Sequence, residues 1–159
     1  MARASRATAS KTLVRTKGVG SRHQLTFDPV TLVVAEGEEP WTAEEMEEVI
    51  SDLRRQHDRV SRVLGDLERE VEGLMRDAGG GAGHDQVDVG SSTLERDQEL
   101  IVVSTERELL VQIERAVAHI GDGSYGSCDG CGEAIGKMRL MAFPRATLCL
   151  SCKQREERR

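Results

Sequence analysis

The amino-acid sequence predicts a mainly α-helical protein: an antiparallel two-helix coiled-coil hairpin with a C-terminal four-cysteine zinc-finger module and a disordered N-terminal tail. Two stretches within residues 41–121 repeat apolar residues every three or four positions, which is typical of helices with one buried face. All four cysteines lie within residues 122–159, in two Cys-x-x-Cys pairs. Only 3% of the 159 residues are aromatic, so paired helices and a metal-bound module fit better than a large globular core.

The cysteine pairs carry the strongest signal. Seventeen residues separate Cys131 from Cys149, which matches the pattern in which two tight turns each give two thiolates to one Zn²⁺. Four sulfurs complete a tetrahedron and leave no position for substrate, so such a site is structural. We therefore predict one structural Zn²⁺, held by Cys128, Cys131, Cys149 and Cys152.

Three other uses of the cysteines fit less well. Two disulfides require an oxidising compartment, and the N-terminus lacks the apolar stretch of a secretory signal. A redox centre normally uses one Cys-x-x-Cys pair on a βαβ scaffold. The spacing also differs from the cysteine runs that bind iron–sulfur clusters in ferredoxins.

Composition argues against several classes of function. The formal net charge is −6, and four thiolates with one Zn²⁺ add about −2, so the chain lacks the basic surface of an autonomous nucleic-acid binder. There is no open metal position and no glycine-rich phosphate loop after a strand, so no enzymatic activity is expected. No apolar run reaches the ~18–20 residues of a membrane span, and we expect a cytoplasmic protein.

Residues 1–40 are expected to form a basic disordered tail and a linker. From Ala2 to Arg22 there are six basic residues and no acidic one, among small and polar residues. Such a tail either contacts an acidic partner weakly or is simply solvated. Farther on, only residues 31–35 have the character of a strand, and one strand is not stable alone. We treat this segment as a linker that docks on another part of the chain.

The hairpin is assigned to residues 41–121. Thr42 and Glu45 form a capping box at the start of the first helix, which should run to about Asp77, or ~50 Å at 1.5 Å per residue. Its apolar stripe is expected to comprise Met46, Val49, Leu53, Val60, Val63, Leu67 and Leu74, widened by Ile50, Leu64 and Val71.

A glycine-rich run at residues 78–83 should end the first helix. A second helix is predicted from about Ser92, which pairs with Glu95 in a capping box, to about Gly121, and it should pack antiparallel to the first. Its stripe is expected to comprise Leu94, Ile101, Val102, Thr105, Leu109, Ile113, Ala116, Val117 and Ile120. The tip of the hairpin, residues 84–90, carries Asp85 and Asp88, which on their own are ordinary acids of a turn or of a helix start.

Together these features resemble the DksA/TraR family of bacterial zinc-finger transcription regulators. The resemblance covers residues 41–159 and rests on the tip motif Asp85-x-x-Asp88 and on the segment around the cysteines. That segment reads Gly-Ser-Tyr-Gly-x-Cys-x-x-Cys-Gly from Gly123, followed by Ile135, Arg139-Leu140, Pro144 and the second cysteine pair. The chain departs from the family's pattern at Gly90, where the family has an alanine.

The resemblance implies a partner and a mechanism. Family members bind RNA polymerase and insert the hairpin into its secondary channel, with the acidic tip nearest the catalytic Mg²⁺. By this likeness Asp85 and Asp88 are the expected contacts to the polymerase active centre, while Gly90 is expected to change the potency or direction of the effect. Family members often act with the alarmone ppGpp, a candidate second partner for which no residue of this chain is assigned.

Other residues near the helices and cysteines have two interpretations. His57 and His119 are interpreted as residues at the edge of the core rather than metal ligands, since four cysteines already satisfy zinc. The cations around the cysteines either contact the rim of the polymerase or offset the charge of the metal centre; they are Lys137, Arg139, Arg145 and Lys153.

Two functions from other classes remain as alternatives. A zinc-ribbon nucleic-acid binder would use the basic tail and the cations near the cysteines, and steep salt dependence of its DNA affinity would favour it. A thiol-based redox sensor would release zinc on mild oxidation, with a matching loss of activity.

Overall fold

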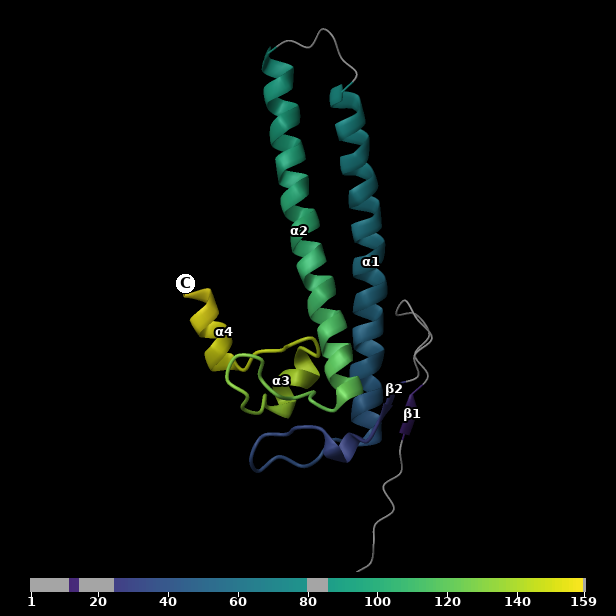
Figure 1. Ribbon diagram of the computed structural model, residues 1–159, viewed down its shortest axis with the longest axis vertical. Helices are drawn as coiled ribbons and strands as arrows, with labels where there is room; N and C mark the ends of the chain where they lie inside the picture. The colour runs from purple at the N-terminus through teal and green to yellow at the C-terminus, as the bar shows by residue number, and fades with distance from the viewer. Residues whose placement is uncertain (1–11, 15–24, 80–85, 159) are drawn as a thin grey trace, which may run out of the picture. The chain divides into compact units, whose positions relative to one another are not determined.

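The computed structural model describes residues 12–14, 25–79 and 86–158 (Figure 1). These residues form two compact units. One unit is Arg55–Ile113, and the other contains the described residues before Arg55 and after Ile113. The elements are strands β1 (Thr12–Val14) and β2 (Leu25–Phe27), a 3₁₀ helix (Pro29–Thr31), and helices α1 (Ala43–Gly79), α2 (Gln86–Asp122), α3 (Lys137–Ala142) and α4 (Leu150–Glu157). The prediction of a mainly helical protein with a two-helix hairpin is confirmed.

Helix α1 begins with the predicted capping box. The backbone N–H of Glu45 donates to the Thr42 hydroxyl over 3.2 Å, and the N–H of Thr42 donates to the Glu45 carboxylate over 2.8 Å. Two backbone donors that have no partner within the helix are thereby satisfied. The helix ends at Gly79, at the start of the glycine-rich run that was expected to end it.

Helix α2 begins at Gln86, six residues before the predicted start at Ser92, so that prediction is wrong. No proline interrupts residues 86–91, and an acidic residue in the first turn of a helix, as Asp88 is, interacts favourably with the helix dipole. The helix continues through Gly121 to Asp122. It ends there because Gly123 adopts a positive φ of 85°, a conformation that glycine takes without strain.

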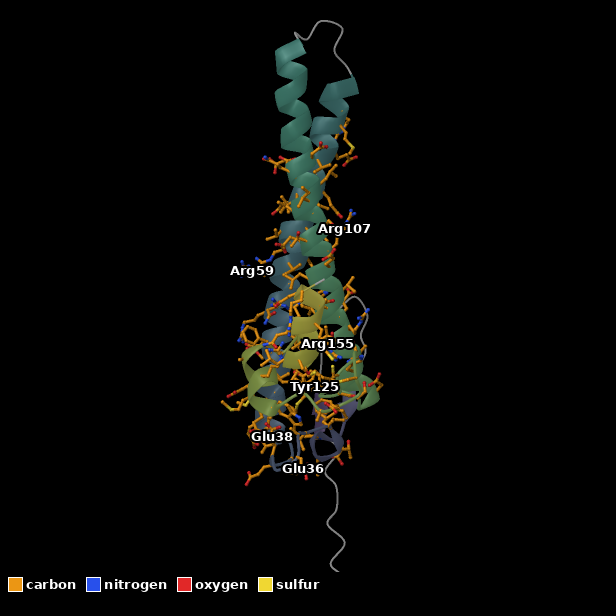
Figure 2. The ribbon with its side chains drawn as sticks, turned by 90° about the vertical axis from the view of Figure 1, so that its left-hand side faces the viewer. Glu36, Glu38, Arg59, Arg107, Tyr125 and Arg155 are labelled. Carbon is orange, nitrogen blue, oxygen red and sulfur yellow. The ribbon has the colours of Figure 1, made fainter. Side chains whose placement is uncertain are left out.

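Within the Arg55–Ile113 unit, α1 and α2 run side by side (Figure 1) and bury one line of apolar side chains. Leu64 and Val71 of α1 pack in a cluster with Val103 of α2, with Leu67 and Leu110 partly buried against them. Arg107, labelled in Figure 2, donates to the Glu68 carboxylate over 2.6 Å across the pair. Residues 64–71 thus face residues 103–110, as expected for an antiparallel pair.

Part of the predicted stripe faces solvent instead. Val63 is 38% exposed, Ile101 67% and Val102 45%. The buried line passes through Val103 and Leu110 of α2, while Glu99 and Glu106 are half-buried. Polar residues occupy half-buried positions on the face of α2 that packs against α1. A prediction from the apolar residues of α2 alone therefore assigns the wrong face of the helix to the core. Thr105, also placed in the stripe, is exposed and donates its hydroxyl to the Ile101 carbonyl over 2.9 Å.

The other unit has a core drawn from distant parts of the sequence. The ring centroids of Trp41 and Tyr125 lie 5.9 Å apart, and both side chains are almost completely buried. Other fully buried side chains of this unit come from α1, α2 and the cysteine-containing segment: Met46, Leu53, Ile120, Ile135 and Leu140. This core joins the start of α1, the end of α2 and the segment that follows α2.

The segment before α1 docks on this unit, although residues 31–35 do not form the strand that their composition indicates. The N–H of Val33 donates to the Tyr125 carbonyl over 3.1 Å, and the Trp41 indole N–H reaches the Val33 carbonyl over 3.4 Å. Leu32 is buried. Earlier in the chain, β1 pairs antiparallel with β2, with Thr12 opposite Phe27. The predicted disordered tail otherwise lies outside the described residues, as do all six of its basic residues.

None of the helices in the described part of the chain combines the length and the apolar content that a membrane span needs.

Candidate metal centre

The structure brings the four cysteines together. Their Sγ atoms all lie within 4.8 Å of one another, and those of Cys131 and Cys149 are 3.8 Å apart. Four thiolates bound to Zn²⁺ at ~2.3 Å in a tetrahedron have sulfur–sulfur separations of ~3.8 Å. The donor set and its geometry therefore fit one structural Zn²⁺, as predicted.

The first cysteine pair lies in a tight hairpin. The N–H of Cys128 donates to the Glu133 carbonyl over 2.8 Å, and the N–H of Gly132 donates back to the Cys128 carbonyl over 2.8 Å. Gly132 takes a positive φ of 77°, which lets the chain reverse immediately after Cys131. A β-bridge between Ser127 and Ala134 closes the base of the turn.

The second pair lies at the start of α4. Cys149 is the N-cap residue of this helix and Cys152 lies in its first turn, so that one helix start orients both thiols. The N–H of Asp129 donates to the Thr147 carbonyl over 2.8 Å and holds the two pairs together. Gly130 leaves room for the second pair, because a Cβ at this position would lie 3.0 Å from the Cys152 sulfur.

Hydrogen bonds to sulfur differ among the cysteines. Cys128 accepts from the backbone N–H groups of Cys149, over 3.2 Å, and Gly130, over 3.4 Å. Cys152 accepts from the guanidinium of Arg155 over 2.8 Å. The Ser151 hydroxyl, 3.1 Å from Cys149, lowers the pKa of that thiol to about 6, which favours the thiolate that zinc binds.

The last turns of α2 contact the segment that carries the first cysteine pair. The N–H of Tyr125 donates to the His119 carbonyl over 3.0 Å, and the Tyr125 hydroxyl donates to the Pro144 carbonyl over 3.0 Å. Burial of this phenol raises its pKa. His119 and Arg115 also lie 3.7 and 3.6 Å from the Asp129 carboxylate.

Both histidines lie where residues at the edge of a core are expected. The side chain of His119 is 20% exposed and contacts Asp129 rather than a cysteine, and that of His57 is 12% exposed and lies 3.4 Å from Asp58. Neither belongs to the cysteine cluster that could hold a metal.

Lys137 has a structural setting that the sequence did not indicate. Its ammonium lies 2.6 Å from the Glu45 carboxylate and 5.1 Å from the centroid of the Trp41 ring, and its side chain is only 12% exposed. The backbone N–H of Lys137 donates to both carboxylate oxygens of Glu38, a residue on the loop before α1 (Figure 2). These contacts tie the finger to the linker and to the start of α1. Glu38 was not singled out from the sequence, because its partner lies 99 positions away.

The other cations around the cysteines differ in exposure. Arg139 is half-buried and donates to the Leu148 carbonyl over 3.3 Å, which braces the loop before the second pair. Arg145 is half-buried. The side chain of Lys153 is 44% exposed and forms an ion pair of 2.8 Å with Glu156.

The predicted tip lies at the limit of what the structure describes. Asp85 is outside the described residues, while Asp88 and Gly90 belong to the first turns of α2, where the backbone alone is described. Gly90 is therefore a helical residue rather than a residue of the connecting loop.

Known proteins are similar to this chain over the zinc-finger segment and, in some cases, over most of the chain. The model of the prokaryotic dksA/traR C4-type zinc finger matches residues 123–158. The RNA polymerase-binding transcription factor DksA of Caulobacter vibrioides is 41% identical over 75 residues, which are 47% of this chain and 53% of that protein. The protein of the same name from Escherichia coli K12 is 29% identical over 130 residues, covering 78% of this chain and 85% of that protein. Residues 123–158 therefore match the finger of the DksA/TraR family, and most of the chain is similar to DksA proteins.

The fold agrees with that of a solved DksA protein. The structure of transcription factor DksA2 from Pseudomonas aeruginosa matches with a TM-score of 0.58 and 29% identity, over 73% of this chain and 85% of that one. The match to the Caulobacter DksA spans only about half of that relative's length, whereas the matches to the Escherichia coli and Pseudomonas proteins extend well beyond the finger.

Proposed function

We propose that this protein is a zinc-containing transcription regulator that binds RNA polymerase directly and modulates initiation by inserting the hairpin tip into the secondary channel. The observation that carries the proposal is the four-cysteine cluster of a DksA/TraR finger in the same chain as a two-helix hairpin. Relatives that align over most of their length bear the name of RNA polymerase-binding transcription factors.

The chemistry expected of each part follows from its residues. Zn²⁺ held by four cysteines cross-links the finger and supplies no catalysis, because no coordination position stays open. Helices α1 and α2 have 37 residues each, or ~55 Å of helix, which gives the hairpin the length to enter a narrow pore. Asp85 and Asp88 would then present hard oxygen groups to a Mg²⁺-bound water or to a basic loop of the polymerase.

The proposed role is regulatory rather than enzymatic, and it places the protein in the cytoplasm with its polymerase. The exposed Lys153 and the half-buried Arg139 and Arg145 are the proposed rim contacts. Lys137 is less suited to this role because Glu45 already engages its charge. Joint action with ppGpp is retained as part of the proposal, without assigned residues.

The first experiment is a titration of fluorescently labelled, zinc-loaded protein with RNA polymerase core, with double-stranded DNA as a parallel titrant. Saturable binding to polymerase with little binding to DNA is expected. Binding to DNA alone would favour the zinc-ribbon nucleic-acid binder and would contradict the proposal.

The tip is tested in a transcription assay with Asp88→Asn. This variant is expected to bind zinc and polymerase but to lose the transcriptional effect, because the charge near the active centre is removed. Asp97→Asn is a matched control, since Asp97 is an exposed aspartate farther along α2. Normal activity of the Asp88 variant would refute the tip assignment and leave polymerase binding intact.

A further inference from the structure

The four sulfurs of the candidate zinc centre have unequal surroundings. Cys128 and Cys152 are buried, at 2% and 7% exposure, and both accept N–H hydrogen bonds. Cys131 is exposed, and its sulfur lies 3.9 Å from the Glu133 carboxylate. A zinc ion with four thiolates carries a net charge of about −2, so a cation stabilises the centre and a neighbouring carboxylate does not.

Arg155 brings a full positive charge to one of these sulfurs. Its Nη2 atom lies 2.8 Å from Sγ of Cys152, so the guanidinium donates a hydrogen bond directly to this sulfur, and an ionised donor strengthens such a bond. The two residues are three positions apart on α4, where Figure 2 labels Arg155, and residues at this spacing lie on the same face of a helix. The contact is therefore built into one element and does not depend on distant packing.

Other cations near the centre have separate roles. Lys137 is paired with Glu45, Arg139 donates to the Leu148 carbonyl, and Lys153 is paired with Glu156. Arg155 differs from these three because it donates to the sulfur of Cys152, one of the predicted zinc ligands.

We propose that Arg155 is a positioning residue of the zinc centre, which fixes the Cys152 thiolate toward the metal and offsets its negative charge. Zinc is then held most firmly on the side of Cys152 and Cys128, and competing chelators or thiol reagents enter from the exposed side of Cys131. This inference rests on the zinc assignment and is independent of polymerase binding. Partners that orient metal ligands in this way typically change metal affinity by about 10- to 100-fold.

The test compares zinc transfer from full-length protein to the chromophoric chelator 4-(2-pyridylazo)resorcinol. Arg155→Gln is expected to lose zinc about tenfold more readily than the wild type, and Arg155→Lys, which keeps the charge, is expected to recover part of the difference. Arg158→Gln is the matched control, because Arg158 follows the same helix and donates to the Gln154 carbonyl instead of a sulfur. Equal zinc loss from the two glutamine variants would overturn the proposal.

A second measurement separates this role from a general loosening of the finger. Zinc-loaded protein is treated with N-ethylmaleimide, and mass spectrometry follows the order in which the cysteines react. Cys131 should react first in the wild type, and Arg155→Gln should accelerate Cys152 more than Cys131. A uniform acceleration of all four cysteines would show that Arg155 only stabilises α4, which contradicts the proposal.

Discussion

In the unit that contains the cysteines, the rings of Trp41 and Tyr125 are in contact although the two residues are 84 positions apart in the sequence. The candidate zinc site joins the turns that carry the two cysteine pairs. In the Arg55–Ile113 unit, by contrast, two helices bury a narrow line of side chains around Leu64, Val71 and Val103. The first unit is stabilised by contacts between distant segments and by metal. The second depends on helix formation and on a thin apolar contact, so disturbing the two units should have different signatures.

The described part of the helical unit also buries one polar atom without a partner. Within the described residues, Oε2 of Glu99 is buried without a hydrogen-bond partner, and a buried unsatisfied oxygen costs about 1–3 kcal/mol. The paired helices of the Arg55–Ile113 unit are therefore expected to be less stable than the cysteine-containing unit with its zinc bound. Four perturbations, from the largest effect to the smallest, test this contrast.

Removal of zinc should have the largest effect. Because structural zinc sites contribute about 10 kcal/mol or more to folding, a chelator should unfold the cysteine-containing unit and expose Trp41, which is 1% exposed and is the only tryptophan in the sequence. Trp fluorescence should shift to longer wavelength, while far-UV circular dichroism retains the helical signal of the Arg55–Ile113 unit. Cys128→Ser should reproduce the shift. An unchanged Trp41 emission after measured zinc loss would contradict the contrast.

Gly126→Ala should destabilise the same unit while leaving its zinc ligands in place. Gly126 has a φ of 98°, and a Cβ there would overlap the carbonyl oxygen of Val33, so the linker has to move. We expect a loss of about 2–3 kcal/mol in urea unfolding followed by Trp41 fluorescence. Gly123→Ala is the control, because Gly123 has a φ of 85° and open space around it, so only about 1 kcal/mol is expected. Equal losses would show that linker docking adds little.

Glu99→Leu should stabilise the helical unit. The substitution removes a buried unsatisfied oxygen and adds apolar surface beside α1, which should raise the stability of the paired helices by about 1–2 kcal/mol. Thermal melting followed by circular dichroism at 222 nm in zinc-free protein measures this gain. Glu108→Leu, at an exposed position of the same helix, should change little. If the Glu99 variant melts no later than this control, the buried oxygen is not a weak point.

Acid should weaken the cysteine-containing unit through the ion pair of Glu45 and Lys137. The hydrogen bond from Lys137 holds the pKa of Glu45 below its ordinary value of 4.5. Its contribution to stability is therefore complete above about pH 4.5 and is lost as the pH falls through the lower pKa of the folded protein. Trp41 fluorescence in urea at several pH values measures this dependence. Glu45→Gln should flatten the curve below pH 4.5, whereas Glu44→Gln should not.

The sequence was most informative where the signal was local. The four cysteines predicted the metal cluster because each pair lies in its own turn, and Thr42 with Glu45 predicted a helix start because both partners are three residues apart. A capping motif is less decisive when the preceding residues can also form a helix. Ser92 offered such a motif, yet α2 begins at Gln86.

What the sequence could not predict depended on partners far along the chain. Which of Ile101, Val102 and Val103 is buried is decided by α1, and the periodicity of α2 alone chose the first two. Lys137 resembled a surface cation until the structure placed Glu45 and Trp41 against it. Glu38 contacts the backbone of a residue 99 positions away, and no local pattern marks such a pair.

The docking of the linker bears on how such a finger can be inherited. The segment that matches the family's zinc finger begins at residue 123. Val33 and Trp41, which precede both long helices in the sequence, contact Tyr125 of this segment. A gene fragment that encodes residues 123–158 alone would yield a peptide with the Tyr125 ring uncovered and Lys137 without its carboxylates. The finger is therefore a poor unit for domain shuffling. The linker before α1 and the segment 123–158 are expected to be gained, lost and diversified together.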